Sequence, residues 1–257
     1  MHLLLSISYS FLISVIAFRL KFLSFRGSLA AFFFGAIIYF VGGLKWSVPI
    51  LFFFFLSSFV THLRRKIYTN STVLLFESER RNGNQVLANG VFPILLILAY
   101  NFYHKELLYL CYVSAIAGVF ADTMATEIGS LSKFKTYDIV NLKQVVPGTS
   151  GGISIYGILG GLLASVLLAL IVSPWLSNEK YFIIVIVSGF FANLVDSILG
   201  STLQAKYKCV VCLQYTEKNL HCNQNAKHVK GLKYLNNDGV NLITSVTGAF
   251  IPALITN

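Results

Sequence analysis

Long apolar runs, separated by short polar stretches, recur along this chain and constrain its fold more than any other sequence feature. Of its 257 residues, 56% are hydrophobic and only 12% are charged. A soluble domain of this length cannot bury so much apolar surface, so lipid must act as its solvent. We therefore predict an all-α, polytopic membrane bundle that forms a single transmembrane domain over residues 1–257.

Eight runs come close to the roughly 20 residues that a helix needs to cross about 30 Å of hydrocarbon. The predicted spans are Leu3–Phe18, Ser28–Leu44, Trp46–Val60, Leu87–Tyr103, Leu107–Ala121, Ile153–Val172, Tyr181–Gly200 and Val240–Ile255. The third run is short, and one broken span over Leu29–Phe55 is the alternative. The alternating pattern of a membrane β-barrel is absent from the sequence.

The basic residues predict the orientation of the bundle. The chain carries 20 Lys and Arg residues and a net charge of +10. If the N-terminus lies outside, all of them except Lys45, Lys105 and Lys180 fall in inner loops, which is the positive-inside pattern. The basic excess therefore marks orientation rather than nucleic-acid binding, and it gives the inner face a surface that attracts anionic lipid or phosphate.

Polar residues from distant parts of the sequence converge on the cytoplasmic face in this topology. The contributing segments are residues 81–90, 122–127, 145–152, 192–204 and 236–241. The opposite face has no comparable set. We therefore expect an active site at the cytoplasmic face.

Helical spacing places the acidic residues of the spans on stripes of small residues. At about 100° per residue, Asp122 shares a stripe with Gly118, and Asp196 shares one with Asn193. Small residues let helices approach closely in lipid, so both aspartates should point into the bundle. Glu127 lies about 140° around the helix from Asp122 and need not point the same way.

The two intramembrane aspartates favour a bound cation. A lone carboxylate at a helix centre costs about 2.5–3.5 kcal/mol, and the spans hold no Lys or Arg to neutralise it. All-oxygen ligands suit magnesium, which takes a few carboxylates together with waters and substrate phosphates. We predict magnesium on Asp122 and Asp196, with Glu127 as an additional ligand. Hydrogen bonding between helices is the alternative, and it has more weight for the amide side chains.

The loop VVPGTSGG, at residues 145–152, predicts a phosphate site. Its glycines expose backbone N–H groups, and a helix N-terminus should follow at about Ser154. Lys143 lies just upstream and adds a positive charge. A Gly-rich turn before a membrane helix is common, so the motif alone is unspecific. The carboxylates predicted at the same depth strengthen the hypothesis of a phosphate site.

Five strings of the sequence are QVLANG, ADTMATEIG, PGTSGGIS, DSILGSTLQ and NNDGVN. In these strings and their order, over about Arg81 to Gly248, the chain resembles the transmembrane-protein-nineteen family, whose plant and cyanobacterial members include phytyl-phosphate kinase. The D-x-x-A-x-x-x-G core followed by G-T-x-G-G is also similar to polyprenol kinases and CTP-transferases. The resemblance implies phosphoryl transfer from a nucleoside triphosphate, CTP or ATP, to a phytyl or polyprenyl monophosphate, as in tocopherol biosynthesis.

That chemistry needs two polyanions brought together in line, because the acceptor oxygen is already charged and needs no strong base. The expected catalytic residues are Asp122, Glu127, Asp196 and Asp238. The residues expected to hold nucleotide phosphates are Lys143, Gly148, Thr149, Ser150, Gly151 and Gly152. Those expected to orient phosphates or metal-bound water are Asn89, Gln204 and Asn241.

Two other functions are compatible with polar residues inside a membrane bundle. A transporter or channel for a small anion or a lipid would also gather acids and broken helices, although such sites usually lie near the midplane between repeated halves. A structural or assembly factor without chemistry is the third possibility, and the energetic cost of the carboxylates counts against it.

The cytoplasmic loop over residues 205–236 contains a candidate zinc clip. Cys209, Cys212, His221 and Cys222 have a C-x-x-C…H-C spacing that can hold zinc tetrahedrally. With all four positions filled by protein, such a site would be structural. Free thiols in a reducing cytoplasm are the alternative, and a disulfide is not expected on that side of the membrane.

Overall fold

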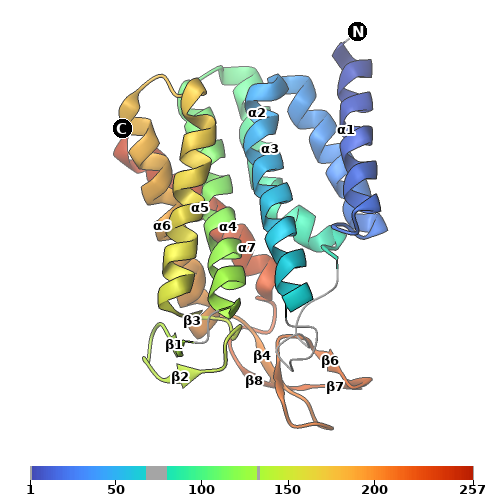
Figure 1. Cartoon of the computed structure of the whole chain (residues 1–257), viewed down its shortest axis with the longest axis vertical. Helices are drawn as coiled ribbons and strands as arrows, with labels where there is room; N and C mark the ends of the chain where they lie inside the picture. Colours follow the sequence, from blue (N-terminus) through green and yellow to red (C-terminus); the bar gives the residue numbers. More distant parts are fainter. Residues whose placement is uncertain (1, 68–79, 132–133, 257) are drawn as a thin grey trace.

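The computed structural model describes residues 2–67, 80–131 and 134–256. Seven long helices lie side by side, and small sheets cover one end of the bundle (Figure 1). The helices are α1 (His2–Arg19), α2 (Phe25–Ile67), α3 (Gly83–Tyr103), α4 (Glu106–Leu131), α5 (Ile155–Val172), α6 (Glu179–Thr202) and α7 (Asn237–Ile255). Within the described ranges, all seven are long and apolar enough to cross a membrane. The predicted helical membrane bundle is confirmed.

Helix α2 consists of two antiparallel arms that meet at Gly43. This residue has φ 59° and ψ −150°, a conformation that glycine adopts readily. Arg81 touches both arms, since its carbonyl oxygen lies against Gly27 and its guanidinium donates to Ser57 Oγ (2.9 Å). A straight helix would separate Gly27 from Ser57 by about 45 Å. The two apolar runs flanking Gly43 therefore form a hairpin, and whether they make two spans or one broken span stays a prediction.

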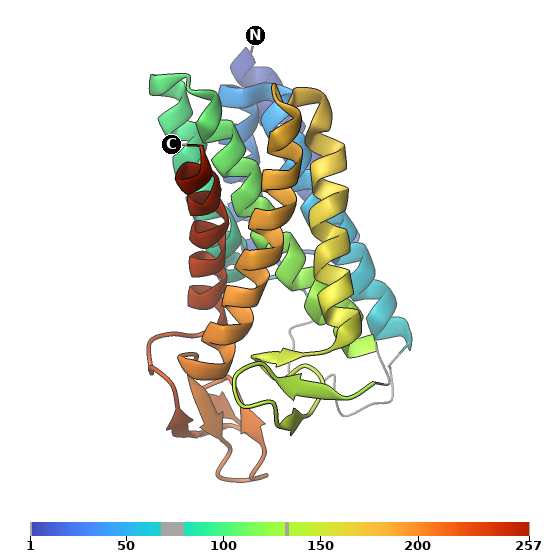
Figure 2. The same cartoon turned by 90° about the vertical axis from the view of Figure 1, so that its left-hand side faces the viewer.

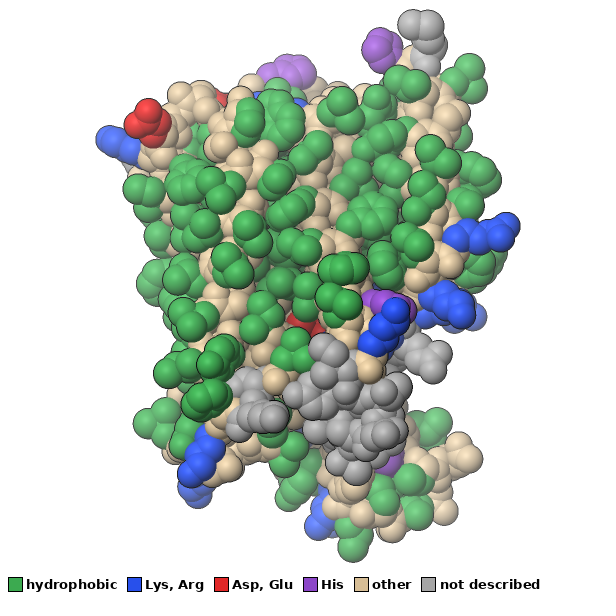
Figure 3. Space-filling view, viewed as in Figure 1, with side chains coloured by type: hydrophobic (Ala, Val, Ile, Leu, Met, Phe, Trp, Pro, Cys, Tyr) green, Lys and Arg blue, Asp and Glu red, His purple; other side chains and the backbone are tan. Residues whose placement is uncertain are grey.

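Two of the eight predicted runs thus belong to α2, and each of the other six corresponds to one helix. The number of bilayer crossings and the outside position of the N-terminus stay predictions. The surface is consistent with lipid contact, because large apolar side chains cover the helical part while Lys and Arg gather mainly toward the strand-bearing end (Figure 3).

Helix α4 lies at the centre of the bundle and is the most buried of the candidate spans. Glycines bring its neighbours close. A Cβ on Gly118 would lie 2.8 Å from that of Ala192, and a Cβ on Gly189 would lie 3.0 Å from that of Ala117. A Cβ on Gly161 of α5 would lie 2.7 Å from the side chain of Asn193. The small-residue stripes predicted from helical spacing are therefore packing faces, as expected.

Small antiparallel sheets lie beyond the ends of α4 and α6 (Figure 2). The first sheet has the order β2-β1-β3, with β1 (Thr136–Asp138), β2 (Gln144–Val145) and β3 (Gly152–Ile153). The second has the order β5-β4-β8, with β4 (Lys206–Lys208), β5 (Tyr215–Thr216) and β8 (Lys227–Lys230). A hairpin pairs β6 (Leu220–His221) with β7 (Gln224–Asn225), and a short 3-10 helix, η2 (Ser173–Trp175), follows α5. The sequence did not predict these strands, because two to four residues are too few for a periodic pattern.

Candidate functional site

A cleft of about 1420 Å³ opens at the strand-bearing end of the bundle. It is highly charged, since five of the ten acidic residues of the chain line it. These are Asp122, Glu127, Asp196, Glu217 and Asp238. Its basic lining residues are Lys21, Arg64, Arg65, Arg81, Lys206 and Lys218. Charges of both signs in one cleft suit the joint binding of cations and polyanions.

Two aspartates from different helices meet in this cleft. Asp122 of α4 and Asp196 of α6 have carboxyl groups within hydrogen-bonding reach of each other. Thr244 of α7 donates its hydroxyl to Asp196 Oδ2 (2.6 Å). Helical periodicity predicted the aspartates but missed Thr244, because a single threonine on an apolar helix gives no distinctive pattern.

The aspartate pair fits a divalent cation. Adjacent carboxylates repel each other unless a positive charge or a proton lies between them. Magnesium is commonly held by one or two carboxylates and completes its shell with waters and substrate phosphates, which an open cleft admits. Asp122 and Asp196 would hold the ion. Among the described residues, no third carboxylate groups with them closely enough to form a three-ligand site.

Glu127 points toward α2 instead of the aspartate pair. Its Oε2 lies 2.8 Å from Arg64 Nε, and its Oε1 accepts a hydrogen bond from the Thr61 hydroxyl (2.5 Å). The side chains of Arg64 and Glu127 are only 7% and 6% exposed. The helical offset of about 140° from Asp122 explains this placement. The expectation of Glu127 as an additional magnesium ligand is corrected to a buried ion pair that joins α4 to α2.

The predicted phosphate loop lines the cleft from residue 145 to residue 154. Gly148 (φ 85°) and Gly151 (φ 81°) adopt the left-handed conformation that favours glycine. A Cβ on Gly151 would lie 2.4 Å from Ser201 N, so the loop is packed directly onto the end of α6. The backbone N–H groups of Gly148, Ser150 and Gly151 make no hydrogen bond to any described residue. These donors are therefore available to an anion.

Two residues expected to contact the nucleotide lie elsewhere. Lys143 is exposed on the first sheet and does not line the cleft. Lys206 contacts the loop instead, donating from Nζ to the Ser150 carbonyl (2.9 Å), and burial together with nearby Lys230 lowers its pKa. Gln204 is buried behind the loop and donates to Ser150 Oγ (3.1 Å), so it positions the loop instead of facing the cleft.

Asp138 is a buried acid that the sequence analysis missed. It accepts hydrogen bonds from the Ser201 hydroxyl (2.8 Å) and from the backbone N–H groups of Val140 (3.0 Å) and Asn141 (3.1 Å). Burial alone raises the pKa of Asp138, but these hydrogen bonds and Lys206 lower it below its ordinary value. Its short-range hydrogen bonds form an Asx turn, a structural role that anchors the first sheet to α6.

The roles expected of the remaining residues stay predictions. Asn89, Asn241 and Asp238 all line the cleft. Asn89 Oδ1 is buried and has no hydrogen-bond partner in the described ranges. Asp238 lies in the first turn of α7, where the helix dipole favours an acid, so its position also has a structural explanation.

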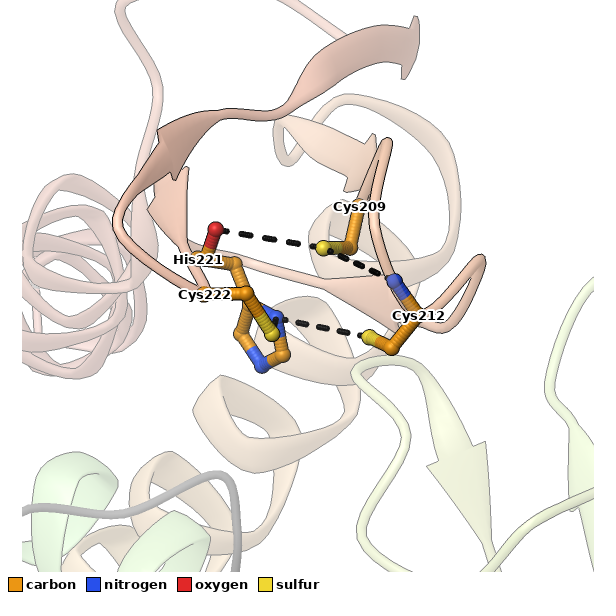
Figure 4. A group of neighbouring side chains, drawn as sticks. All are labelled: Cys209, Cys212, His221 and Cys222. Carbon is orange, nitrogen blue, oxygen red and sulfur yellow. Dashed lines mark hydrogen bonds between the residues drawn. The ribbon is translucent and has the colours of Figure 1, made fainter.

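The four predicted zinc ligands lie together (Figure 4). The ligand atoms of Cys209, Cys212, His221 and Cys222 lie within 4.8 Å of one another. Hydrogen bonds from the N–H groups of Cys212 and Val211 lower the pKa of Cys209 to about 6, which favours the thiolate. His221 also lines the cleft.

The fold and cleft define a polytopic membrane protein with a charged site at one end. The family described as integral membrane protein DUF92 matches residues 8–249, so this chain belongs to that family. The family resemblance read from the five motifs is confirmed. No solved structure matches the chain.

Relatives occur in archaea and plants. The membrane protein MJ0933 of Methanocaldococcus jannaschii is 30% identical over 222 residues, 86% of this chain and 80% of that protein. Protein PGR of Arabidopsis thaliana is 26% identical over 279 residues, 98% of this chain and 96% of PGR. Protein VTE6, chloroplastic, of the same plant is 31% identical over 153 residues, 59% of this chain and 39% of VTE6.

Proposed function

We propose that this protein transfers a phosphoryl group from a nucleoside triphosphate to an isoprenoid monophosphate and so forms the diphosphate. The observation that carries the proposal is the pair Asp122 and Asp196 in a cleft with basic walls and a loop of open backbone donors. Such a site gathers the groups that phosphoryl transfer requires, namely cation ligands, anion donors and positive charge.

The nucleotide would lie along the Gly-rich loop. The N–H groups of Gly148, Ser150 and Gly151 and the ammonium of Lys206 would contact its phosphates. A magnesium ion on the two aspartates would neutralise charge on the β- and γ-phosphates. The fold around Ser150 supports this arrangement, because Gln204 and Lys206 both hold that residue in place.

The acceptor would enter from the side of α1, α2 and α3. There an apolar cavity shares Arg81, Gln85 and Asn89 with the cleft. The apolar cavity is only about 100 Å³, so it could receive the part of a prenyl tail next to the phosphate while the rest of the tail lies in the bilayer. The phosphate would reach the cleft beside the Arg81 guanidinium. This junction of an apolar and a charged cavity is what an amphipathic substrate with a terminal phosphate needs.

The proposed step forms one bond and breaks one. An oxygen of the prenyl monophosphate attacks the γ-phosphorus in line, a new P–O bond forms, and the bond to the β-phosphate oxygen breaks to release nucleoside diphosphate. The attacking oxygen is already anionic, so the chain supplies positioning and charge stabilisation in place of a strong base.

The family supports this reaction. The motif resemblance extends to phytyl-phosphate kinase, and the similarity to chloroplastic VTE6 covers more than half of this chain. By the same resemblance, the cleft would face the cytoplasm or the stroma and the product would serve tocopherol biosynthesis. Magnesium and the nucleotide are parts of the proposal.

The test uses the purified full chain in nanodiscs with phytyl or geranylgeranyl monophosphate, Mg²⁺ and either CTP or ATP. We expect nucleoside diphosphate to form only when the prenyl monophosphate is present. Glu179→Gln, on the opposite end of the bundle, is the matched control and should retain full activity. Prenyl-phosphate flux across liposomes without nucleotide turnover would contradict the proposal in favour of a transporter.

A further inference from the structure

We propose that Cys209, Cys212, His221 and Cys222 bind one structural zinc ion that fixes residues 206–230 as a rigid cap on the cleft. The segment contains β4 to β8, whose strands are two to four residues long. Strands this short bury little apolar surface, and a metal ion is a common substitute for a core in such small units.

The first pair of ligands lies in a turn built around a sulfur atom. The backbone N–H groups of Val211 and Cys212 both point at Cys209 Sγ, at 3.4 and 3.5 Å. The N–H of Cys209 donates to Gln214 across the turn (2.9 Å). Two donors converging on one sulfur stabilise negative charge there, and a metal-bound thiolate carries that charge.

The second pair comes from the hairpin of β6 and β7. Cys222 and Asn223 form its two-residue turn, with φ 50° and 59°. Positive φ at both turn positions is typical of a type I′ turn, in which Asn and Gly are favoured and Cys is uncommon. Turn preference therefore does not explain the cysteine at position 222, whereas metal binding does. The turn places its sulfur 3.3 Å from His221 Nδ1 and beside the first turn (Figure 4).

The distances fit a tetrahedral ion. Zinc–sulfur bonds of about 2.3 Å and tetrahedral angles place neighbouring ligand atoms about 3.5–3.8 Å apart. His221 Nδ1 lies 3.6 Å from Cys212 Sγ, and no pair among the four ligand atoms exceeds 4.8 Å. Three sulfurs and one imidazole in this geometry favour zinc over magnesium or calcium, which prefer oxygen.

The cap touches the phosphate loop directly. Glu217, between β5 and β6, accepts a hydrogen bond from the Ser150 hydroxyl, and Glu217, Lys218 and His221 all line the cleft. Zinc would therefore hold this wall of the cleft against the Gly-rich loop. This consequence for the cleft rests on the proposed function, whereas zinc binding itself does not.

The first experiment measures zinc in the purified full chain by inductively coupled plasma mass spectrometry. We expect about one zinc per chain in the wild type and in Cys111→Ser, the cysteine outside the cluster. His228→Ala is the histidine control and should also keep its zinc, whereas His221→Ala and Cys209→Ser/Cys212→Ser should lose it. Zinc retained by the double variant, or a zinc-free wild type in which the thiols of Cys209, Cys212 and Cys222 all react with a thiol reagent, would overturn the proposal.

A second experiment needs no variant and so avoids misfolding. Cobalt added to the chelator-treated wild type should give intense sulfur-to-cobalt charge-transfer bands and tetrahedral ligand-field bands. Weak octahedral bands without charge transfer would overturn the proposal. Hydrogen exchange of the Thr149 and Gly152 amides, the two loop amides that donate hydrogen bonds within the loop, should accelerate by about tenfold or more on chelation when measured without substrates. Unchanged exchange would contradict the proposal that zinc fixes residues 206–230 against the loop, and it would leave the kinase proposal unaffected.

Discussion

The two ends of α4 differ in how their polar groups are satisfied. Near its start, Tyr109 and Tyr112 pack on Trp46, with ring centroids 5.1 and 4.7 Å apart, and both hydroxyls donate to backbone carbonyls of Lys45 and Trp46. Near its end, Asp122 faces a second carboxylate across an open cleft.

Within one helix, polar groups that are satisfied by the chain itself thus differ from polar groups that are suited to bind a ligand. At the aromatic end, each tyrosine hydroxyl has a partner within the chain and nothing remains for a ligand to satisfy. At the cleft end, the two aspartates repel each other, which favours a bound cation between them. The open N–H groups of the loop favour a bound anion. We therefore expect substitutions of the buried tyrosines at the aromatic end to change stability and those of the aspartate pair and the Gly-rich loop to change activity.

Asp122→Asn should have the largest effect. It removes one of the two negative charges that would hold magnesium, so phosphoryl transfer should fall by on the order of 1000-fold. The melting temperature in detergent should not decrease, because the change relieves repulsion between carboxylates. Transfer is measured as diphosphate formed from labelled nucleotide. Full activity in Asp122→Asn would show that Asp122 is not needed as a magnesium ligand.

Arg64→Met should cost about 3 kcal/mol or more of stability. It removes the Arg64 guanidinium from the buried Glu127 carboxylate. The double variant with Glu127→Met should recover most of that loss, since an apolar pair can replace a buried ion pair. Lys45→Met, at the aromatic end, loses only a cation–π contact worth about 0.5–1 kcal/mol and is the control for charge removal. Denaturant unfolding in micelles measures all three, and equal losses for Arg64→Met and Lys45→Met would contradict the account.

Gly151→Ala should weaken nucleotide use by about tenfold or more. The added Cβ would lie 2.4 Å from the backbone of Ser201, so the phosphate loop must move away from α6. Gly148→Ala is the matched control, because it has a similar positive φ but no described atom within 4 Å of the added Cβ. KM for the nucleotide distinguishes them, and equal values for the two variants would show that contact with α6 does not matter.

Tyr112→Phe should destabilise the bundle by about 0.5–1.5 kcal/mol without changing activity, because it removes the hydrogen bond that the buried Tyr112 hydroxyl donates to the Trp46 carbonyl. Tyr103→Phe, on an exposed ring, should change neither. A loss of activity in Tyr112→Phe at unchanged stability would contradict the claim that the aromatic end contributes to stability and not to activity.

Helical periodicity predicted much of this arrangement, and the reasons are visible in particular residues. Asp122 and Asp196 lie on regular helices, so a fixed angle per residue places them on packing faces beside Gly118 and Asn193. The Gly-rich loop was recognisable because Gly148 and Gly151 occupy positions that few other residues tolerate.

Other features depend on contacts that a pattern does not encode. The Arg64–Glu127 pair joins residues more than sixty positions apart, and Lys206 replaces Lys143 at the loop because β4 begins there after α6 ends. The fold-back of α2 depends on one backbone conformation, at Gly43. Sequence spacing gives no distance for any of these contacts.

The smallest expected effect is a local pH dependence at the first sheet. Because the pKa of Asp138 is lowered in the folded chain, its carboxylate stabilises the sheet above the pKa of the unfolded state. That contribution is lost as the pH falls through the folded value. Hydrogen exchange of residues 136–153 should therefore accelerate on acidification beyond the intrinsic rate change, and Asp138→Asn should abolish this dependence. The same acceleration in Asp138→Asn would assign it to another group.

The central claim is that Asp122 and Asp196 share a divalent cation, and Mn²⁺ binding followed by electron paramagnetic resonance tests it most directly. With a non-hydrolysable nucleotide analogue, the wild type should bind Mn²⁺ at one tight site. Asp122→Asn and Asp196→Asn should each weaken that binding by about 100-fold or more, and Glu127→Gln much less. Equal Mn²⁺ affinity in the wild type and both aspartate variants would contradict the account.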